Sequence, residues 1–548
     1  MLKITMNDET SREVQFGTCV GTLFEGAKYD YEILAAKINN KIYSLDKELR
    51  YNSSVAPVFS NTTDGLNVYR RSLCLLLAAS AQKLFPKKRL LVGHSLGSGY
   101  YYTLHSEEEL SQSIIDALEN EMRSIVEKNI PITSEFISYQ EALDYFKKEN
   151  LPATLHQMDF MCPPRVKIVK LQEFRNVYFG PVVPSTGFLK TFELKKYAEG
   201  FLLRFPKPTD PNTIPPFEDQ PKLFQIYSSY KKWGTRLGVS SVAQLNQMIV
   251  ERKINDFIDI TETLQEKCIA DIADQIASRK KVRVVLIAGP SSSGKTTTSK
   301  RLALELLAIG YHPKLISLDN YYVGHDRTPR DENGNFDFEC IEALDVPLLN
   351  QNLMDLFDGK EVALPLYNFH TGEQMQGGGE KIKLEANDIL IIEGIHGLND
   401  RLTPKIPAEL KFKIYLSALT QLNLDDQNRI STSDNRLIRR IVRDHNFRGK
   451  SAAGTIAMWP AVRKGEELHI FPFQNNADAI LNTALDYELS VLKVYAEPLL
   501  RCVKPTQEEY SEACSLLHFL DNFATIAPDA VPPRSIIREF IGGSAFKY

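Results

Sequence analysis

The sequence predicts a multidomain α/β protein with a parallel sheet in its C-terminal half. The chain has 548 residues, which is enough for three or four domains. From Lys281 onward, short apolar runs alternate with helical segments, a rhythm typical of parallel sheets. A proline-rich stretch at 205–221 separates this part from an N-terminal half that begins with short, alternating strand patterns.

The composition is that of an ordinary globular chain. Hydrophobic residues make up 43% and charged residues 24%, and the net charge is −4, so any basic site must be local. The seven cysteines are widely spaced without a CxxC pair, which argues against a disulfide framework or a cysteine zinc site. The N-terminus lacks the pattern of a secretory signal, and no apolar stretch reaches the length of a membrane span. We therefore expect a cytoplasmic protein without a membrane partner.

The N-terminal half divides into two predicted domains. Residues 1–60 form a small β-rich unit, in which Leu2, Ile4 and Met6 alternate with polar residues; a helix is expected near Tyr31–Asn39. Residues 61–204 are predicted to be α+β. Their expected helices lie at 67–85, 106–128 and 139–149, and their expected strands at 89–93 and 100–104.

Three further segments complete the predicted organisation. Residues 205–280 are a proline-rich linker followed by helices, and residues 281–505 are the parallel α/β domain. Residues 506–548 are a C-terminal helix and tail.

The most specific motif directly follows the buried strand predicted at 282–288. Its residues are Gly289, Pro290, Ser291, Ser292, Ser293, Gly294, Lys295, Thr296 and Thr297. They match G-x-x-x-x-G-K-[ST] between a strand and a helix, the context in which backbone N–H groups wrap a phosphate. Lys295 would reach the β- and γ-phosphates of ATP, and the Thr296 hydroxyl would bind Mg²⁺. The alternative is a glycine-rich turn with a solvated lysine.

Two carboxylates follow the next predicted strands of the same sheet. Asp319 ends the strand at 313–318, where it could accept a proton from an attacking hydroxyl, although a helix N-cap is the other interpretation. Glu393 ends the strand at 388–392 and could hold Mg²⁺ beside the phosphate loop.

An arginine-rich segment spans residues 436–450. Its basic residues are Arg436, Arg439, Arg440, Arg443, Arg448 and Lys450, against the single acid Asp444. Beside a phosphate loop it suggests a mobile lid that neutralises phosphoryl charge and excludes water. A solvated helix face or an RNA-binding patch remains the alternative.

Residues 281–500 resemble the uridine kinase and phosphoribulokinase family. The matching pieces are GPSSSGKTT, LDNYY, NFDFE, PLYNF, IIEGIHGLN and RLxRRxxRDxxxRG. The resemblance implies that Asp319 is the base for a ribose 5′-hydroxyl and that Arg443 and Arg448 are catalytic lid residues alongside Lys295. It also implies a nucleoside site built from Tyr322, Phe336, Asp337, Tyr367, His370, Arg440 and Lys450. Lys450 stands where the family commonly has an arginine, and His370 lies closer to Tyr367 than the family's base-reading histidine does. The resemblance therefore leaves the identity of the nucleobase open.

The N-terminal half resembles two domains of threonyl-tRNA synthetase. Residues 1–60 resemble its TGS domain, and residues 61–204 resemble its editing domain through KLFP, GSGYYYTL and GPVVPSTG. The family's HxxxH pair falls here on Arg71 and Leu75, and its cysteine and histidine fall on Tyr178 and Val182. These side chains cannot perform that chemistry, so we expect a binding, regulatory or oligomerising module without editing activity. RNA contact and homo-oligomerisation remain open.

A second short motif, Gly93–Gly97, matches the G-x-S-x-G nucleophile elbow. An elbow must turn into a helix, whereas the residues after Gly97 predict a strand. We therefore expect a strand–turn–strand.

The predicted function is an ATP- and Mg²⁺-dependent nucleoside kinase acting on uridine or cytidine. A sugar-phosphate kinase of the same fold is the first alternative, although the aromatic residues Tyr321, Tyr322, Phe336 and Tyr367 favour a base. An RNA-binding or nucleotide-sensing regulator with a residual phosphate loop is the second, and an intact general base argues against it.

Overall fold

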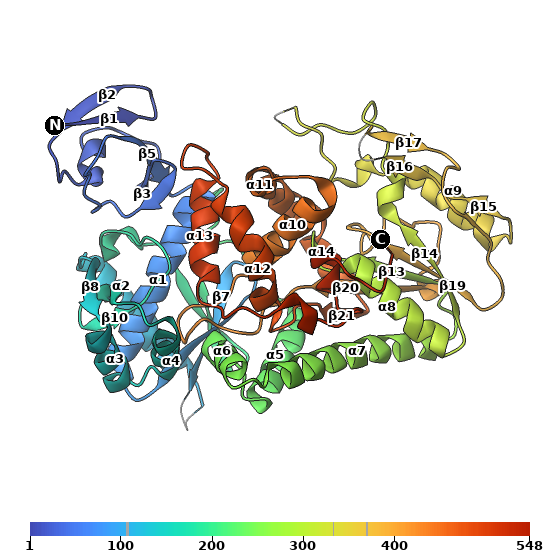
Figure 1. Ribbon diagram of the computed structural model, residues 1–548, viewed down its shortest axis with the longest axis horizontal. Coiled ribbons are helices and arrows are strands. Elements are labelled where there is room, and N and C mark those ends of the chain that lie inside the picture. The colour runs from blue at the N-terminus through green and yellow to red at the C-terminus, as the bar shows by residue number, and fades with distance from the viewer. Residues whose placement is uncertain (106–108, 333, 369–370, 548) are drawn as a thin grey trace. The chain divides into compact units, whose positions relative to one another are not determined.

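The computed structural model describes residues 1–105, 109–332, 334–368 and 371–547, and it divides into two compact units (Figure 1). The first unit comprises residues 1–251, 421–431 and 497–524. The second comprises residues 252–420, 432–496 and 525–548. The predicted fold class is confirmed: a β-rich N-terminal region precedes an α/β region with a parallel sheet.

The second unit is built on a five-stranded parallel sheet in the order β14-β19-β13-β20-β21. The strands are β13 (Val284–Ala288), β14 (His312–Ser317), β19 (Asp388–Glu393), β20 (Lys411–Ser417) and β21 (Ala479–Asn482). All of β13 is buried, which explains why its sequence is apolar without alternation.

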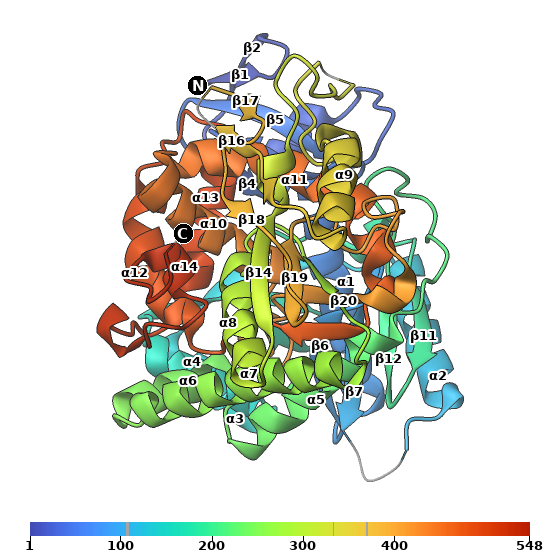
Figure 2. The same ribbon diagram turned by 90° about the vertical axis from the view of Figure 1, so that its right-hand side faces the viewer.

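Helices cover both faces of this sheet (Figure 2). Val285 and Ile287 of β13 pack with α7 (Ile254–Ser278) and α8 (Lys295–Ala308). Val284 and Leu286 point to the other face and pack with α9 (Val346–Phe357). Because parallel strands end at a common edge, this arrangement brings the residues after β13, β14 and β19 to one crevice.

The second unit contains further helices and short strands. The helices are α10 (Thr432–Arg448), α11 (Ala452–His469) and α14 (Arg538–Ile541), and the first part of α12 (Glu488–Arg501) also belongs here. The short strand pairs are β15 (Val362–Ala363) with β18 (Lys381–Ile382) and β16 (Leu366–Asn368) with β17 (Glu373–Met375).

The N-terminal sheet of the first unit has the order β2-β1-β5-β3-β4. Its strands are β1 (Leu2–Met6), β2 (Ser11–Val14), β3 (Ile33–Ile38), β4 (Lys41–Tyr43) and β5 (Ser53–Phe59). The helix predicted near Tyr31–Asn39 is wrong, because this segment contains β3. Leu34 and Ala35 contribute to one core and Ala36 and Ile38 to another, so the strand is apolar on both faces and lacks alternation.

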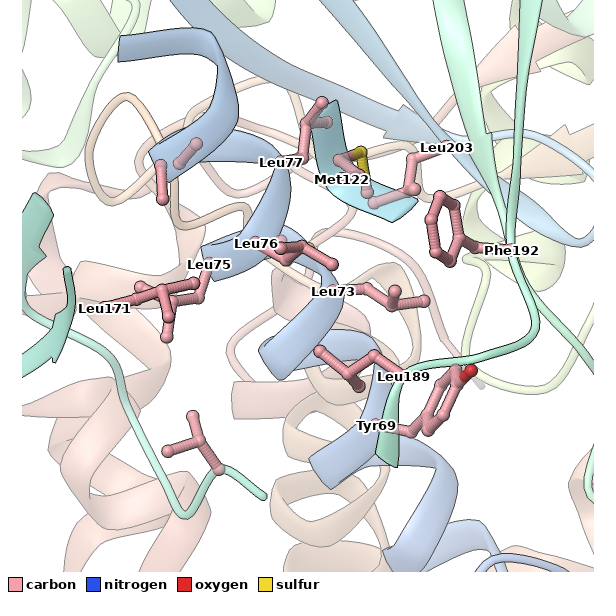
Figure 3. Packing of buried hydrophobic residues seen from close by; sticks show 14 of the residues in the cluster. Tyr69, Leu73, Leu75, Leu76, Leu77, Met122, Leu171, Leu189, Phe192 and Leu203 are labelled. Carbon is pink, nitrogen blue, oxygen red and sulfur yellow. The ribbon is translucent and has the colours of Figure 1, made fainter. Parts of the chain in front are cut away.

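Helix α1 (Thr63–Leu84) forms the centre of the next part of the first unit. Figure 3 shows its leucines among side chains from other segments, including Met122, Leu171 and Phe192. The helix confirms the prediction at 67–85. Helices α2 (Gln112–Glu127), α3 (Tyr139–Lys148) and α4 (Pro152–Met161) follow it in the chain.

Two antiparallel sheets accompany these helices, in the orders β11-β12-β7-β6 and β10-β9-β8. Their strands are β6 (Arg89–Ser95), β7 (Gly99–His105), β8 (Thr133–Ser138), β9 (Arg165–Leu171), β10 (Phe174–Asn176), β11 (Glu193–Tyr197) and β12 (Gly200–Arg204). Ser95 pairs with Tyr100 in the β6–β7 hairpin, which confirms the strand–turn–strand and excludes a nucleophile elbow there.

The remaining helices of the first unit are α5 (Pro221–Arg236), α6 (Val242–Val250) and α13 (Tyr510–Leu520). Residues 421–431 and 497–524 reach this unit from the later part of the chain. Among the described residues, no helix is both long enough and apolar enough to cross a bilayer.

Candidate nucleotide-binding site

The phosphate loop connects β13 to α8, as predicted. Ser292 and Gly294 have positive φ values of 58° and 83°, so the backbone curls tightly at these positions. A Cβ on Gly289 would lie 2.6 Å from the Leu416 oxygen, which explains the need for glycine there. The loop therefore leads into the first turn of α8, whose N–H groups suit an anion.

Lys295 is the first residue of α8, at the end of this loop. Its Nζ donates hydrogen bonds to the carbonyl oxygens of Gly289 (2.9 Å) and Pro290 (3.2 Å). Burial lowers its pKa, while the negative charges of Glu393 and Asp319 act in the opposite direction. The ammonium group is thus placed among acids at the mouth of the loop, where it can exchange backbone oxygens for phosphate oxygens.

Glu393 connects the loop to the end of β19. Its Oε1 accepts hydrogen bonds from Thr296 Oγ1 (3.3 Å) and Ser317 Oγ (3.0 Å). Burial, followed by the charge of Asp319, raises the pKa of Glu393 to about 7. A hydroxyl and a half-buried carboxylate at hydrogen-bond distance are oxygen ligands of the kind that Mg²⁺ prefers.

Three further hydroxyl groups at the loop also fit a phosphate ligand. Ser292, Ser293 and Thr298 are buried, and their hydroxyl oxygens have no hydrogen-bond partner within the described part of the chain. Buried polar groups normally find partners. A bound nucleotide would supply acceptors at this position.

Asp319 follows β14 in a short 3₁₀ turn, Leu318–Tyr321, and is exposed. Its charge affects the pKa values of Lys295, Glu393 and Arg448, so the base predicted from the sequence lies within electrostatic range of the loop, the acid and the arginine helix. An exposed carboxylate at the carboxyl edge of the sheet can receive a proton from a substrate hydroxyl.

The arginine helix, α10, is not a mobile lid along its whole length. Arg436 and Arg439 are almost fully buried and form ion pairs with Glu466 and Glu488. Arg436 also donates to the Ser291 carbonyl oxygen at 2.9 Å. The lid hypothesis is therefore wrong for these two arginines, because buried guanidinium groups in ion pairs are held in place and cannot act as a mobile lid.

The next arginines of α10 cluster around one acid. Arg440 donates to Ser291 Oγ (2.6 Å) and lies 3.3 Å from Asp444. Arg443 and Arg448 lie 2.8 Å and 3.7 Å from Asp444 Oδ1. Although burial favours the neutral acid, Arg443 and Arg440 outweigh it and lower the pKa of Asp444. Asp444 thus fixes the arginines that are predicted to contact phosphates.

Lys450 lies beyond the end of α10. Its backbone N–H donates to the backbone carbonyl oxygen of Asp444 at 3.1 Å, and its Nζ lies 3.1 Å from Met458 Sδ. The structure therefore places this predicted substrate residue next to the arginine cluster.

Aromatic side chains gather beside Asp319. The Tyr322 ring lies 5.6 Å from that of Tyr367 and 5.9 Å from that of Phe338, centroid to centroid. Phe336 stacks on His325 at 4.8 Å. These rings could form one side of a slot for a planar group.

Tyr321 does not belong to that slot. It is 1% exposed and its hydroxyl accepts a hydrogen bond from Asn352 Nδ2, so it is a core residue. Asp337 receives the Glu339 N–H on its Oδ1 at 3.0 Å. His370 lies outside the described residues.

Two acids that the sequence did not single out lie at the site. Glu466 is fully buried and accepts a hydrogen bond from the Ser291 N–H at 3.2 Å. Burial, together with the charge of Glu466, raises the pKa of Glu339 to about 7. Glu339 belongs to the NFDFE motif, which could have indicated it, whereas nothing local marks Glu466.

The residues at the four replaced editing positions pack within the first unit. Leu75, Tyr178 and Val182 are buried. Arg71 donates to the Pro181 carbonyl oxygen at 2.7 Å. The substituted residues thus contribute to packing.

Comparisons with known proteins agree with both halves of this description. Residues 284–490 match the model of the phosphoribulokinase / uridine kinase family. Threonine–tRNA ligases match the N-terminal region: that of Desulforamulus reducens is 31% identical over 37% of this chain and 32% of its own length, and that of Streptococcus mutans is 29% identical over 37% and 31%. The chain thus spans about a third of the length of these relatives.

Solved structures align with part of the chain. One is titled a possible uridine kinase from Bacillus stearothermophilus, with 21% identity, a TM-score of 0.27, and coverage of 39% of this chain and 98% of that one. Another is D-glycerate 3-kinase from Cryptococcus neoformans, with 14% identity, a TM-score of 0.22, and coverage of 51% and 88%. Residues 284–490 are thus similar to the phosphoribulokinase / uridine kinase family, and the N-terminal region is similar to part of threonine–tRNA ligases.

Proposed function

We propose that this protein transfers the γ-phosphate of ATP to the 5′-hydroxyl of a pyrimidine nucleoside, uridine or cytidine. The observation that carries the proposal is the position of Asp319, an exposed carboxylate within electrostatic range of Lys295 and followed in the chain by Tyr322 of the aromatic cluster. A base for the hydroxyl and a platform for a planar ring thus meet beside a phosphate loop.

In this reaction the 5′-oxygen of the nucleoside attacks the γ-phosphorus of ATP and ADP leaves, while Asp319 accepts the proton of the 5′-hydroxyl. Lys295 and the loop N–H groups hold the phosphates, and Arg443 and Arg448 neutralise the charge that develops on the transferred group. Thr296 and Glu393 would hold Mg²⁺, which would help to neutralise the charge of the phosphates.

We place this activity in the cytoplasm, because widely spaced cysteines suit a reducing compartment. The N-terminal region is proposed to be a binding or oligomerising module, with RNA as the ligand to test first.

The test is a coupled ADP-release assay with MgATP against nucleosides, ribulose 5-phosphate and no acceptor. Turnover with uridine or cytidine supports the proposal. Turnover with the sugar phosphate alone would retain the phosphoryl transfer but overturn the substrate. Silence across the panel, together with an RNA gel shift by the full chain, would favour the regulator.

A further inference from the structure

The C-terminal segment forms part of the second unit and packs against the phosphate loop. Ile536 and Phe540 are fully buried. A Cβ on Gly294 would lie 2.7 Å from Ile536 Cγ2, so this segment lies directly against the loop where α8 begins. Residues 525–548 lie beyond the family match, which ends at 490, so this contact is an addition to the matched region.

Glu539 of this segment occupies donors on the first turn of α8. Its Oε2 accepts hydrogen bonds from the Thr297 N–H at 3.1 Å and from Thr297 Oγ1 at 2.6 Å. Thr297 follows Thr296, the predicted Mg²⁺ ligand. The first N–H groups of a helix have no partner within the helix and readily bind anions, and in a phosphate loop that anion is a nucleotide phosphate.

The contact between Glu539 and Thr297 adds a carboxylate to a site that already holds two others, and this disfavours the binding of an anionic nucleotide. Glu539, Glu393 and Asp319 all act on Lys295. A carboxylate and a phosphate oxygen are both anionic acceptors, so they cannot share the Thr297 donors, and close approach would cost further energy through repulsion. In contrast, the hydroxyls of Ser292 and Ser293 have no partner in the described residues, so only part of the loop is occupied.

We propose that the Glu539 carboxylate is an internal competitor for a nucleotide phosphate at the first turn of α8. This inference rests on the proposed function, because it assumes that the loop binds nucleotide phosphates. A nucleotide binds fully only in molecules whose Glu539 side chain has left Thr297. The apparent affinity for the nucleotide is therefore reduced in proportion to the fraction of molecules in which Glu539 occupies the Thr297 donors. The C-terminal segment thereby sets the nucleotide concentration at which the protein acts.

The experiment is calorimetric titration of the full chain with MgADP and, separately, with inorganic tripolyphosphate. The variants are Glu539→Gln, which removes the charge, and Glu539→Asp, which keeps the charge but shortens the side chain. Glu409→Gln, at an exposed position of the same unit, is the matched control. If Glu539 occupies the Thr297 donors in about nine of ten molecules, the Gln variant binds both probes about tenfold tighter. The Asp variant gains most of this, and the control gains nothing.

Each other outcome overturns the proposal in a distinguishable way. Unchanged or weaker binding by both variants, with the unfolding temperature retained, would make Glu539 a structural cap. A change with MgADP but not with tripolyphosphate would place Glu539 at the ribose or base. If neither the native protein nor any variant bound either probe, the phosphate loop would be inactive and the proposed function would fail as well. If the Gln variant did not fold, the Asp variant would decide by the same criteria.

Discussion

Arg89 and Asp426 form a bidentate ion pair inside the first unit, although 337 positions separate them in the chain. The Arg89 Nε and Nη2 atoms lie 2.7 Å and 2.6 Å from the two carboxylate oxygens. Around this pair, the Val92 N–H donates to the backbone carbonyl oxygen of Asp426 at 2.9 Å, and Asn423 Nδ2 donates to the carbonyl oxygen of Val92. Residues 421–431, which link β20 to the arginine helix, are thus anchored on β6.

Replacing Arg89 by alanine is expected to destabilise the first unit. Asp426 is 3% exposed, so its carboxylate would lose its charged partner in a buried position. We expect a loss of about 1–3 kcal/mol in the free energy of unfolding, measured by urea denaturation. Arg50→Ala, which breaks an exposed pair with Glu48, should change stability by less than about 1 kcal/mol. Equal effects of the two substitutions would contradict the anchoring role.

Asp425 should make the stability of the first unit depend on pH. Burial raises its pKa to about 7 from an ordinary value near 4. Between these values the folded protein binds a proton that the unfolded chain releases, so native stability falls as pH rises from about 4 to 7 and then levels off. In Asp425→Asn this decline is absent. The advantage of the variant in unfolding temperature should therefore grow from pH 5 to pH 7 and stay constant at pH 8. A difference that does not vary with pH would refute the assignment.

Substitutions at Asp319 and Lys295 should separate chemistry from binding. Asp319→Asn removes the proposed base but keeps the shape of the side chain, so we expect kcat to fall about 10²–10⁴-fold with unchanged affinity for ATP. Lys295→Met should abolish ATP binding itself. Initial rates and calorimetry distinguish the two, and Asp358→Asn, an exposed acid of the second unit, should behave like the native protein. Near-normal turnover by Asp319→Asn would show that another group is the base.

Glu466 is expected to position the phosphate loop. Glu466→Gln would leave the buried Arg436 without its charged partner and weaken the bond to the Ser291 N–H. We expect a stability loss of about 1–3 kcal/mol and a several-fold higher KM for ATP, with a smaller effect on kcat. The neighbouring Glu467→Gln is the control, because that side chain is 62% exposed. An unchanged KM in the destabilised variant would limit Glu466 to a structural role.

The sequence by itself determined the parts of the site that are contiguous in the chain. A strand, a glycine-rich loop and a helix follow one another at 284–308, and this local order is what predicts a phosphate-binding loop. The same holds for Glu393, the last residue of β19, and for Asp319, two residues after β14, because parallel strands end at one edge of the sheet. The helix predicted near Tyr31–Asn39 is instead strand β3, because burial on both faces removes the alternation that marks a strand.

Only the tertiary structure decided which charges neutralise one another. The arginine-rich helix looks uniform in sequence. In the structure, however, Arg436 and Arg439 are buried in ion pairs with Glu466 and Glu488. The later arginines of the helix cluster around Asp444. Likewise, the contact of Glu539 with Thr297 spans 242 positions, and the Arg89–Asp426 pair 337. Such pairs depend on how distant segments pack together, and no local propensity or spacing encodes them.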